Sequence, residues 1–403
     1  MTLLSGYDFR QPAGPTPFPH PRPPLYNADG NALNFPVYGP LVEALRSVPE
    51  VARVEGLSMR NGDSGSVNSV PLVHLAASLV AGSMEIGNPT AMVAALARMI
   101  AKNAAEAWRV AVLSGVRISD RHDLGNSLFL VPLDQVPDTT NKIRLLNRED
   151  SLCTPAAALV HIFEVRDFFC GPQEAAVVPK EHEARVVMMR DAADCIMIAA
   201  DAPAGIVAEW TLIAEAAAPR FPDSIMTVDP AVAYTFAPDV ALEGSRVEEA
   251  GDTLKNWVAF GGDKRSLRTA CSRLRRSRRN HMHSEDRAID LGIALEVLLS
   301  HGAHSDQEIT YRLSTRGAWL AGCDAAERRR IAGQLKAVYG LRSKAVHTGA
   351  VPSSVTINGS RTDIFSALEE GENLCGRLVR AVLARDGWPD WETLTLGGVC
   401  QRP

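Results

Sequence analysis

Hydrophobic and polar positions follow helical spacing most clearly in the C-terminal third of the chain. Three helical blocks are predicted there, over residues 284–299, 306–320 and 326–346. At 100° per residue, six apolar residues cover one broad face of the first block, so this helix is expected to be largely buried. These residues are Leu291, Ile293, Ala294, Leu295, Val297 and Leu298. Ser284 is a suitable N-cap for the first block, and Gly349 is a suitable stop for the third.

Two carboxylates interrupt the apolar face of the first block. Asp290 falls in the middle of that face, and Glu296 lies at its edge. A buried carboxylate needs a partner, and nearby arginines are the obvious candidates. In the second block, Glu308 and Arg312 are spaced as an i,i+4 ion pair of the favourable orientation.

Upstream of these blocks the pattern is mixed. Residues 41–115 are predicted to be helical, most clearly residues 90–113. Runs typical of strands follow, bounded by Gly, Pro, Asn and Asp. They cover residues 116–118, 127–133, 159–169, 184–189, 195–199 and 206–212, with 225–228 and 231–236 as two further candidates. Residues 246–260 are predicted to begin a helical C-terminal region.

The predicted fold class is therefore α+β, a mixed N-terminal module followed by an all-helical bundle. The expected organisation is a proline-rich arm over residues 1–40, an α+β module over 41–250, a helical domain over 251–390 and a tail over 391–403. Trp388 and Trp391 are expected to pack back onto the body of the protein.

Composition narrows the class of protein. The chain has 403 residues, 46% of them hydrophobic, and a formal net charge of −5. Its seven cysteines are scattered without a Cys-x-x-Cys pair, which favours a reducing cytoplasm and argues against a zinc site or a disulfide framework. We expect no metal, no cofactor and no membrane span. Dinucleotide-binding glycine motifs, phosphate loops and nucleophile elbows are missing from the N-terminal part.

The most informative motif is Arg342-Ser343-Lys344-Ala345-Val346-His347, near the end of the third block. An arginine binds phosphate through a rigid fork of donors, and a histidine transfers protons near neutral pH. Such a pair on one short helical segment suits metal-free cleavage of RNA. Alone, an Arg-x4-His motif is a weak signal, because it occurs by chance in many proteins.

The flanking residues strengthen this signal. Residues 290–296, 311–314 and 341–347 read DLGIALE, YRLS and LRSKAVH, in that order. Together they resemble the HEPN superfamily, specifically its ApeA-like branch. The family usually carries Asn, Asp or His after the arginine, whereas this chain has Ser343. The resemblance implies a helical bundle that forms a homodimer and cleaves RNA without a metal, leaving a 2′,3′-cyclic phosphate and a 5′-hydroxyl.

The resemblance also assigns roles to individual residues. Arg342 would stabilise charge on the phosphate, and His347 would transfer protons at the 2′-oxygen or the leaving 5′-oxygen. Asp290 or Glu296 would orient Arg342, with Ser343 and Arg312 in supporting positions. The implied substrate is tRNA or another structured RNA, because an unpaired loop allows a flexible 2′-hydroxyl to reach the site. The implied setting is antiviral defence or toxin-like growth arrest, with a phage-derived or nucleotide trigger acting on the N-terminal module.

A basic run precedes the bundle. Residues 264–279 contain eight cations and no acid, although the whole chain is acidic. Such a run can bind an RNA backbone, or it can pair with acidic parts of the same protein. The residues expected to contact RNA are Arg268, Arg273, Arg275, Arg276, Arg278 and Arg279, together with Lys344.

Two other functions stay open. The helical domain can be a catalytically silent module that dimerises or binds RNA, which Ser343 and the basic run allow. Alternatively, the N-terminal module is itself an enzyme without a recognisable motif. Loss of RNA cleavage on substitution of Arg342 would separate the first alternative from the nuclease. Activity that survives deletion of residues 265–403 would support the second.

Overall fold

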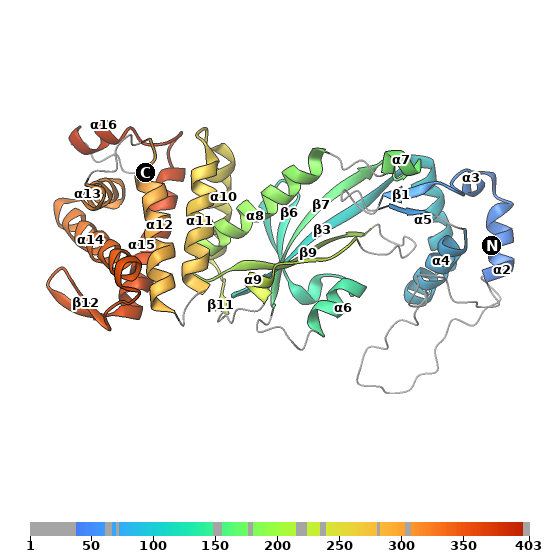
Figure 1. Ribbon diagram of the computed structural model, residues 1–403. Helices are drawn as coiled ribbons and strands as arrows, with labels where there is room; N and C mark the ends of the chain where they lie inside the picture. Colours follow the sequence, from blue (N-terminus) through green and yellow to red (C-terminus); the bar gives the residue numbers. More distant parts are fainter. Residues whose placement is uncertain are drawn as a thin grey trace.

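The computed structural model describes residues 38–60, 67–69, 72–147, 155–175, 180–214, 224–233, 239–279, 283–302 and 308–397. Figure 1 shows N-terminal helices at one end, a twisted sheet in the middle and a helical bundle at the other end. The fold is α+β, as the sequence predicts. The proline-rich arm lies almost wholly outside the described residues. No helix among the described ranges combines the length and the apolar character needed to cross a bilayer.

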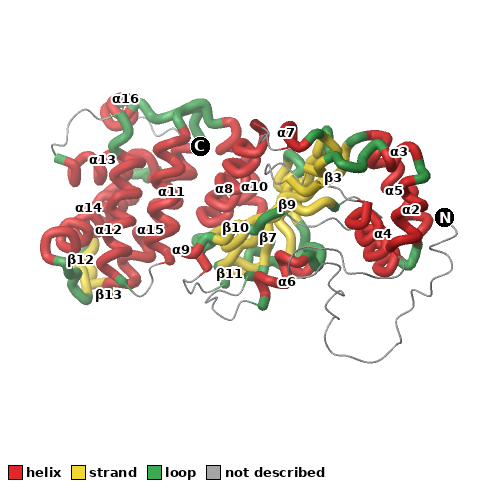
Figure 2. The backbone as a smooth tube through the Cα atoms, turned by 45° about the vertical axis from the view of Figure 1, so that its right-hand side comes forward, coloured by secondary structure: helices red, strands yellow, loops and turns green. Residues whose placement is uncertain are grey.

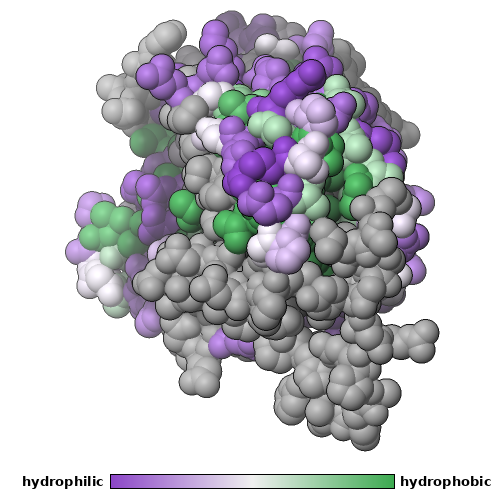
Figure 3. Space-filling model, turned by 90° about the vertical axis from the view of Figure 1, so that its right-hand side faces the viewer, coloured by the Kyte–Doolittle hydropathy of each residue, from purple (hydrophilic) through white to green (hydrophobic). Residues whose placement is uncertain are grey.

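In the part of the chain that the structure describes, the N-terminal end contains the helices α2 (Tyr38–Arg46), α3 (Pro49–Ala52), α4 (Leu72–Ile86) and α5 (Pro89–Lys102). They enclose their own apolar core, which includes Leu75, Leu79 and Met92. A small antiparallel sheet of order β2-β1-β8 lies beside them, formed by β1 (Ser58–Arg60), β2 (Val67–Ser69) and β8 (Phe169–Cys170). The short helix α7 (Pro172–Ala175) follows β8. Seen from this end, the described surface mixes hydrophilic and hydrophobic side chains (Figure 3).

The central sheet has six strands in the order β10-β9-β3-β7-β6-β5, and its strands pair antiparallel. They are β3 (Ala104–Ser114), β5 (His122–Gly125), β6 (Leu128–Pro132), β7 (Ala157–Arg166), β9 (Gly205–Ile213) and β10 (Thr227–Val228). Long β3 and β7 pair from Ala104–Arg166 to Leu113–Ala157. The short elements η1 (Leu133–Gln135), α6 (Thr140–Leu146), α9 (Pro230–Ala233), β4 (Val116–Arg117) and β11 (Val240–Ala241) complete this part.

The prediction of helix over residues 41–115 is wrong at β1 and β2, and over residues 90–113 it is wrong in the second half. Helix α5 ends at Lys102 because Asn103 adopts a left-handed conformation with φ 48°. The chain then enters β3, the strand between β9 and β7. A strand buried on both faces has a continuous apolar sequence, which periodicity does not distinguish from a buried helix. Residues 231–236 were expected to form a strand, but their described part belongs to helix α9.

Two other predicted strands, at 184–189 and 195–199, are also wrong. Both lie within one long helix, α8 (Lys180–Ala200). This segment is rich in Ala and Met, which are strong helix formers, and it contains no Gly or Pro that would divide it. The remaining strand predictions, at 116–118, 127–133, 159–169, 206–212 and 225–228, coincide with β4, β6, β7, β9 and β10 to within a few residues.

The C-terminal bundle contains the predicted helical blocks. Its helices are α10 (Ser245–Ala259), α11 (Lys264–Arg279), α12 (Ser284–Leu299), α13 (Ile309–Ala321), α14 (Ala325–Thr348), α15 (Ile364–Leu383) and α16 (Trp391–Leu396). A hairpin of β12 (Ser354–Ile357) and β13 (Ser360–Asp363) joins α14 to α15. Figure 2 shows the helices side by side, with this hairpin at the outer end. As expected, the tail packs back: Trp388 stacks on His301, with ring centroids 3.9 Å apart.

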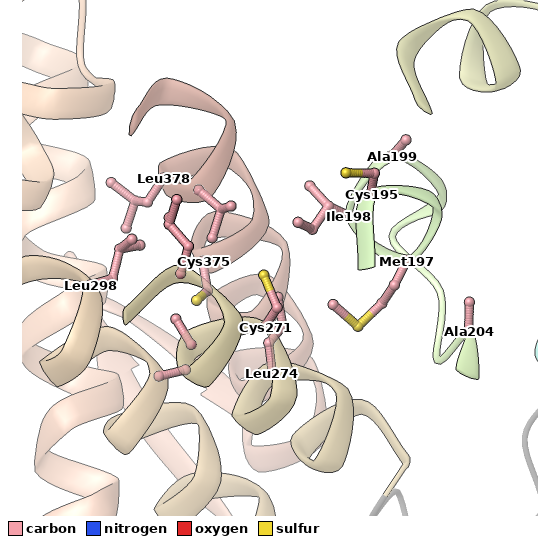
Figure 4. Packing of buried hydrophobic residues seen from close by; sticks show 14 of the residues in the cluster. Cys195, Met197, Ile198, Ala199, Ala204, Cys271, Leu274, Leu298, Cys375 and Leu378 are labelled. Atoms are coloured by element: carbon pink, nitrogen blue, oxygen red, sulfur yellow. The ribbon is translucent and has the colours of Figure 1, made fainter. Parts of the chain in front are cut away.

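Helix α8 joins the sheet to the bundle. One side of it packs on the sheet, and its C-terminal end meets the bundle in a single continuous apolar core. Figure 4 shows Cys195, Met197 and Ile198 of α8 facing Cys271 of α11 and Cys375 of α15. Burial raises the pKa of the Cys375 thiol to about 12, so it packs as a small apolar side chain. The sheet and the bundle therefore share buried surface.

Candidate functional site

Arg342 lies at a close contact between α14 and α12. The contact point on α12 is Gly292. A Cβ atom placed there would lie 2.3 Å from Cγ and 2.7 Å from Cβ of Arg342, closer than real atoms approach. The absence of a side chain at Gly292 therefore allows the stem of Arg342 to pack directly on the backbone of α12.

Glu296, one helical turn further along α12, binds the head of Arg342. An oxygen of its carboxylate lies 3.3 Å from Nη2 of Arg342, and the Tyr339 hydroxyl donates to it at 2.5 Å. The Arg342 guanidinium also lies over the Tyr339 ring, 5.5 Å from its centroid. Burial, with a further contribution from the hydrogen bond to Glu296, raises the pKa of Tyr339 to about 12. Arg342 is thereby held in one place by an anion and an aromatic ring.

His347 lies in the last turn of α14, as predicted. The helix ends at Thr348, and Gly349 follows in the left-handed conformation with φ 68°, its N–H donating to Ala345 O. The prediction of Gly349 as the stop is therefore confirmed. The imidazole is exposed, and so are the neighbouring side chains of Val346 and Lys344. His347 is accessible to a ligand or to another protein.

Arg342 and His347 leave the helix in different directions. Positions 342 and 347 are separated by about 140° around the helix axis and by about 7.5 Å along it. The side chain of Arg342 turns towards α12, where Glu296 holds it, whereas His347 is exposed beyond it. Ser343, between them, is half-buried. The motif in one chain therefore presents an anchored cation and a separate imidazole, rather than a hydrogen-bonded pair.

Asp290 does not orient Arg342. Its buried carboxylate accepts a hydrogen bond from Nη1 of Arg273 at 2.8 Å and pairs with Nε of Arg276 at 3.2 Å. Both arginines belong to α11. Of the two carboxylates that the sequence offered as partners of Arg342, Glu296 fills that place. Arg312 is half-buried on α13, and its supporting role stays a prediction.

The basic run on α11 is neutralised within the protein. Arg268 forms two hydrogen bonds of 2.8 Å with Asp191, and Arg275 pairs with Asp194, both on α8. Arg278 is buried against Asp201. Arg279 is buried too, and it donates to the carbonyl oxygens of Pro203 and Val232 and to the Ser114 hydroxyl.

These contacts change the expected RNA surface. The buried guanidinium groups of Arg278 and Arg279 have no room for a phosphate, and Arg275 is directed into α8. Only Arg276 of the predicted set on α11 keeps most of its side chain exposed, at 62%. The second interpretation of the run, pairing with acidic parts of the same chain, is what the structure shows for most of these side chains.

Sequence reasoning missed the roles of Gly292 and Tyr339. A glycine inside an apolar helical pattern is a sign of close packing, so Gly292 carried a usable signal. Tyr339 lies three residues before Arg342, which places both on neighbouring parts of the helix surface. Nothing in the local pattern, however, shows that the two share Glu296.

Two hollows lined by described residues lie away from this site. One, of about 530 Å³, lies between α10, α13 and α15 and is lined by Glu249, Arg377 and Arg380 among others. Another, of about 630 Å³, lies between α5 and the start of β3, beside Trp108 and Lys102. Among the described residues, no group of three or more His, Cys, Asp and Glu side chains is arranged to hold a metal ion.

No protein-family model, curated protein or solved structure matches this chain. The resemblance to the HEPN superfamily therefore rests on the three sequence motifs. Two of these motifs, at 290–296 and 341–347, lie against each other through the contacts of Gly292 and Glu296 with Arg342.

Proposed function

We propose that this protein is a metal-independent endoribonuclease of the HEPN type, in which Arg342 and His347 act on the RNA. The observation that carries the proposal is the way in which Arg342 is held. Gly292 leaves room for its aliphatic chain, and Glu296 and Tyr339 contact its guanidinium. His347, five residues later, is exposed at the end of the same helix. An anchored guanidinium and an accessible imidazole at one end of the bundle suit chemistry on a phosphodiester.

In the proposed reaction, the ribose 2′-hydroxyl attacks the adjacent phosphorus. The bond from phosphorus to the 5′-oxygen of the next nucleotide breaks, leaving a 2′,3′-cyclic phosphate and a 5′-hydroxyl. One imidazole takes the proton of the 2′-hydroxyl, and another gives a proton to the leaving 5′-oxygen. The guanidinium of Arg342 stabilises the negative charge that develops on the phosphate oxygens.

This scheme needs two imidazoles on opposite sides of the phosphorus, so we propose that the site forms between two copies of the chain. Apolar surface at this end of the bundle supports the proposal. The β12–β13 hairpin places the end of α14 beside the start of α15. Val346 is 50% exposed next to His347, and Phe365 is 48% exposed in the first turn of α15. A second copy would cover these side chains.

We propose tRNA or another structured RNA as the substrate class and the cytoplasm as the compartment. The antiviral or growth-arrest role and the trigger that acts on residues 41–250 come from the resemblance alone. The shared core of α8 and the bundle offers a physical route by which a trigger can reach the nuclease site.

A second candidate is a catalytically silent HEPN module that binds RNA or dimerises. The ion pair between Arg342 and Glu296 favours it, because a guanidinium neutralised by a carboxylate attracts a phosphate less strongly. If the protein is instead a nuclease, the incoming phosphate must share the Arg342 guanidinium with the Glu296 carboxylate.

The deciding experiment compares wild type with His347→Ala in bacteria, with and without phage challenge, by sequencing RNA ends. We expect new 5′-hydroxyl ends in wild-type cells only. His122→Ala, which removes a histidine from β5 of the sheet, is the matched control and should cut like wild type. The purified protein should cut equally well with and without a chelator. Equal RNA ends in wild type and His347→Ala, under both conditions, would favour the silent module.

A further inference from the structure

The chain contains a second basic segment, and most of its cations form no ion pair among the described residues. Residues 328–362, which cover most of α14 and the β12–β13 hairpin, contain no Asp or Glu. Their cations are Arg328, Arg329, Arg330, Lys336, Arg342, Lys344 and Arg361. Among the residues that the structure describes, only Arg342 of this set forms an ion pair. This contrasts with α11, whose arginines mostly pair with carboxylates.

The exposed cations follow one face of α14. At 100° per residue, Lys336 lies about 20° from Arg329 around the helix, and His347 lies at the same angle as Arg329. All three side chains are exposed, and the residues on the opposite face, such as Val338, are buried in the bundle. Basic side chains therefore lead along the outer face of α14 to the proposed catalytic histidine.

The hairpin extends this face sideways. Asn358, at its turn, donates to Arg330 O at 3.0 Å, which fixes the hairpin alongside α14. Arg361 lies on β13, where its Nε donates to the Ser354 hydroxyl at 2.8 Å, and its side chain is exposed. Arg361 and Lys344 thus flank the line from Arg329 to His347 on the hairpin side.

Gly340 is an independent sign that something approaches this face. It lies in the middle of α14, where glycine weakens a helix relative to alanine. Its own chain gives no packing reason for a glycine, because nothing lies within 4 Å of the position that a Cβ would take. A bare backbone between Lys336 and His347 allows a close approach by a ligand outside the chain.

We infer that the outer face of α14 and the β12–β13 hairpin form the RNA-binding track that leads into the His347 end. The ligand class is the phosphate backbone of an unpaired RNA segment. Arg329 to His347 spans about 27 Å of helix, enough for several nucleotides of an unpaired strand. The inference rests on the proposed function for its choice of RNA and moves the expected binding surface from α11 to α14.

The track is tested by binding rather than by cleavage. The full chain carrying His347→Ala binds a labelled RNA hairpin with a large unpaired loop, and the affinity is measured over a series of salt concentrations. Adding Arg329→Ala and Lys336→Ala should weaken binding at least tenfold at low salt. It should also reduce the salt slope by about 1.4, because each single-strand phosphate contact contributes about 0.7. Lys255→Ala is the control, since Lys255 is also exposed, lies on α10 and pairs with Asp252.

Gly340→Gln separates loss of binding from loss of folding. It adds a good helix former at a position with open space around it, so the helix should become more stable while the side chain obstructs the track and weakens RNA binding. Unchanged affinity and slope in both track variants would overturn the inference, even if wild type cleaves RNA. Loss of binding in these variants without any cleavage by wild type would leave the track standing and reject the nuclease. Equal binding of polyglutamate would replace RNA by an acidic protein partner.

Discussion

Gly292 and Arg342 touch across the α12–α14 interface at a distance that no other residue at position 292 allows. A Cβ at Gly292 would lie 2.3 Å from Cγ of Arg342. The requirement links a position inside a buried helix to the conformation of the proposed phosphate-binding residue. Small changes in the helix packing therefore act directly on the site.

Gly292→Ala should destabilise the protein by about 1–3 kcal/mol, the usual cost of overpacking a core, because α12 and α14 must move apart. Urea unfolding measures this change. Gly340→Ala is the matched control: it is also a helical glycine, but with open space around it, so it should stabilise the protein by about 0.5–1 kcal/mol. If both substitutions stabilise the protein, the close contact at Gly292 is wrong.

Much of the bundle could be predicted because its information is local. The period of apolar residues identified α12 and α14, and Gly349 marked the end of α14. Local pattern also indicated that Asp290 needs a partner. It did not choose between Arg342 and the arginines of α11, because the answer depends on which face of α11 packs against α12.

The errors have a common physical cause. Asp191 and Asp194 lie 77 and 81 residues before Arg268 and Arg275, so no local pattern shows that the basic run is already paired. Asp191 and Asp194 belong to α8, the helix for which strands at 184–189 and 195–199 were wrongly predicted. Once 184–199 is recognised as part of one helix, Asp191 and Asp194 fall three residues apart on one side of it, as partners for α11. The error in α8 therefore also hid the acidic partners of the basic run.

The pH dependence of stability should reveal the Tyr339–Glu296 contact. The pKa of Tyr339 is raised from 10.0 to about 12 in the folded protein, so the unfolded chain releases this proton first. The stabilisation is fully present below pH 10 and is lost as the pH rises towards 12. Free energies of unfolding, measured from neutral pH upwards, should fall more steeply for wild type than for Tyr339→Phe. Parallel pH profiles would mean that this phenol is not perturbed.

The buried ion pair between Arg287 and Glu372 should matter far more than a surface pair. Two hydrogen bonds, of 3.0 and 2.9 Å, join these side chains, and the Ser277 hydroxyl donates to the same carboxylate. Glu372→Ala leaves a buried, uncompensated guanidinium and should cost about 3–5 kcal/mol in unfolding free energy. Asp252→Ala removes the exposed partner of Lys255 and should cost under about 1 kcal/mol. Similar costs for the two variants would contradict the burial of Arg287.

The Arg268–Asp191 pair should couple the sheet to the bundle energetically. Its two hydrogen bonds join α11 to α8, whose other side packs on the central sheet. A double-mutant cycle with Arg268→Ala and Asp191→Ala should give a coupling energy of about 0.5–3 kcal/mol from urea unfolding. If a signal passes from the N-terminal module to His347 through α8, the same variants should also change RNA cleavage, although neither residue lies near the motif. A coupling energy near zero would show that the pair balances charge without joining the sheet to the bundle. The route for a trigger would then have to run through the apolar core around Cys195 and Cys271.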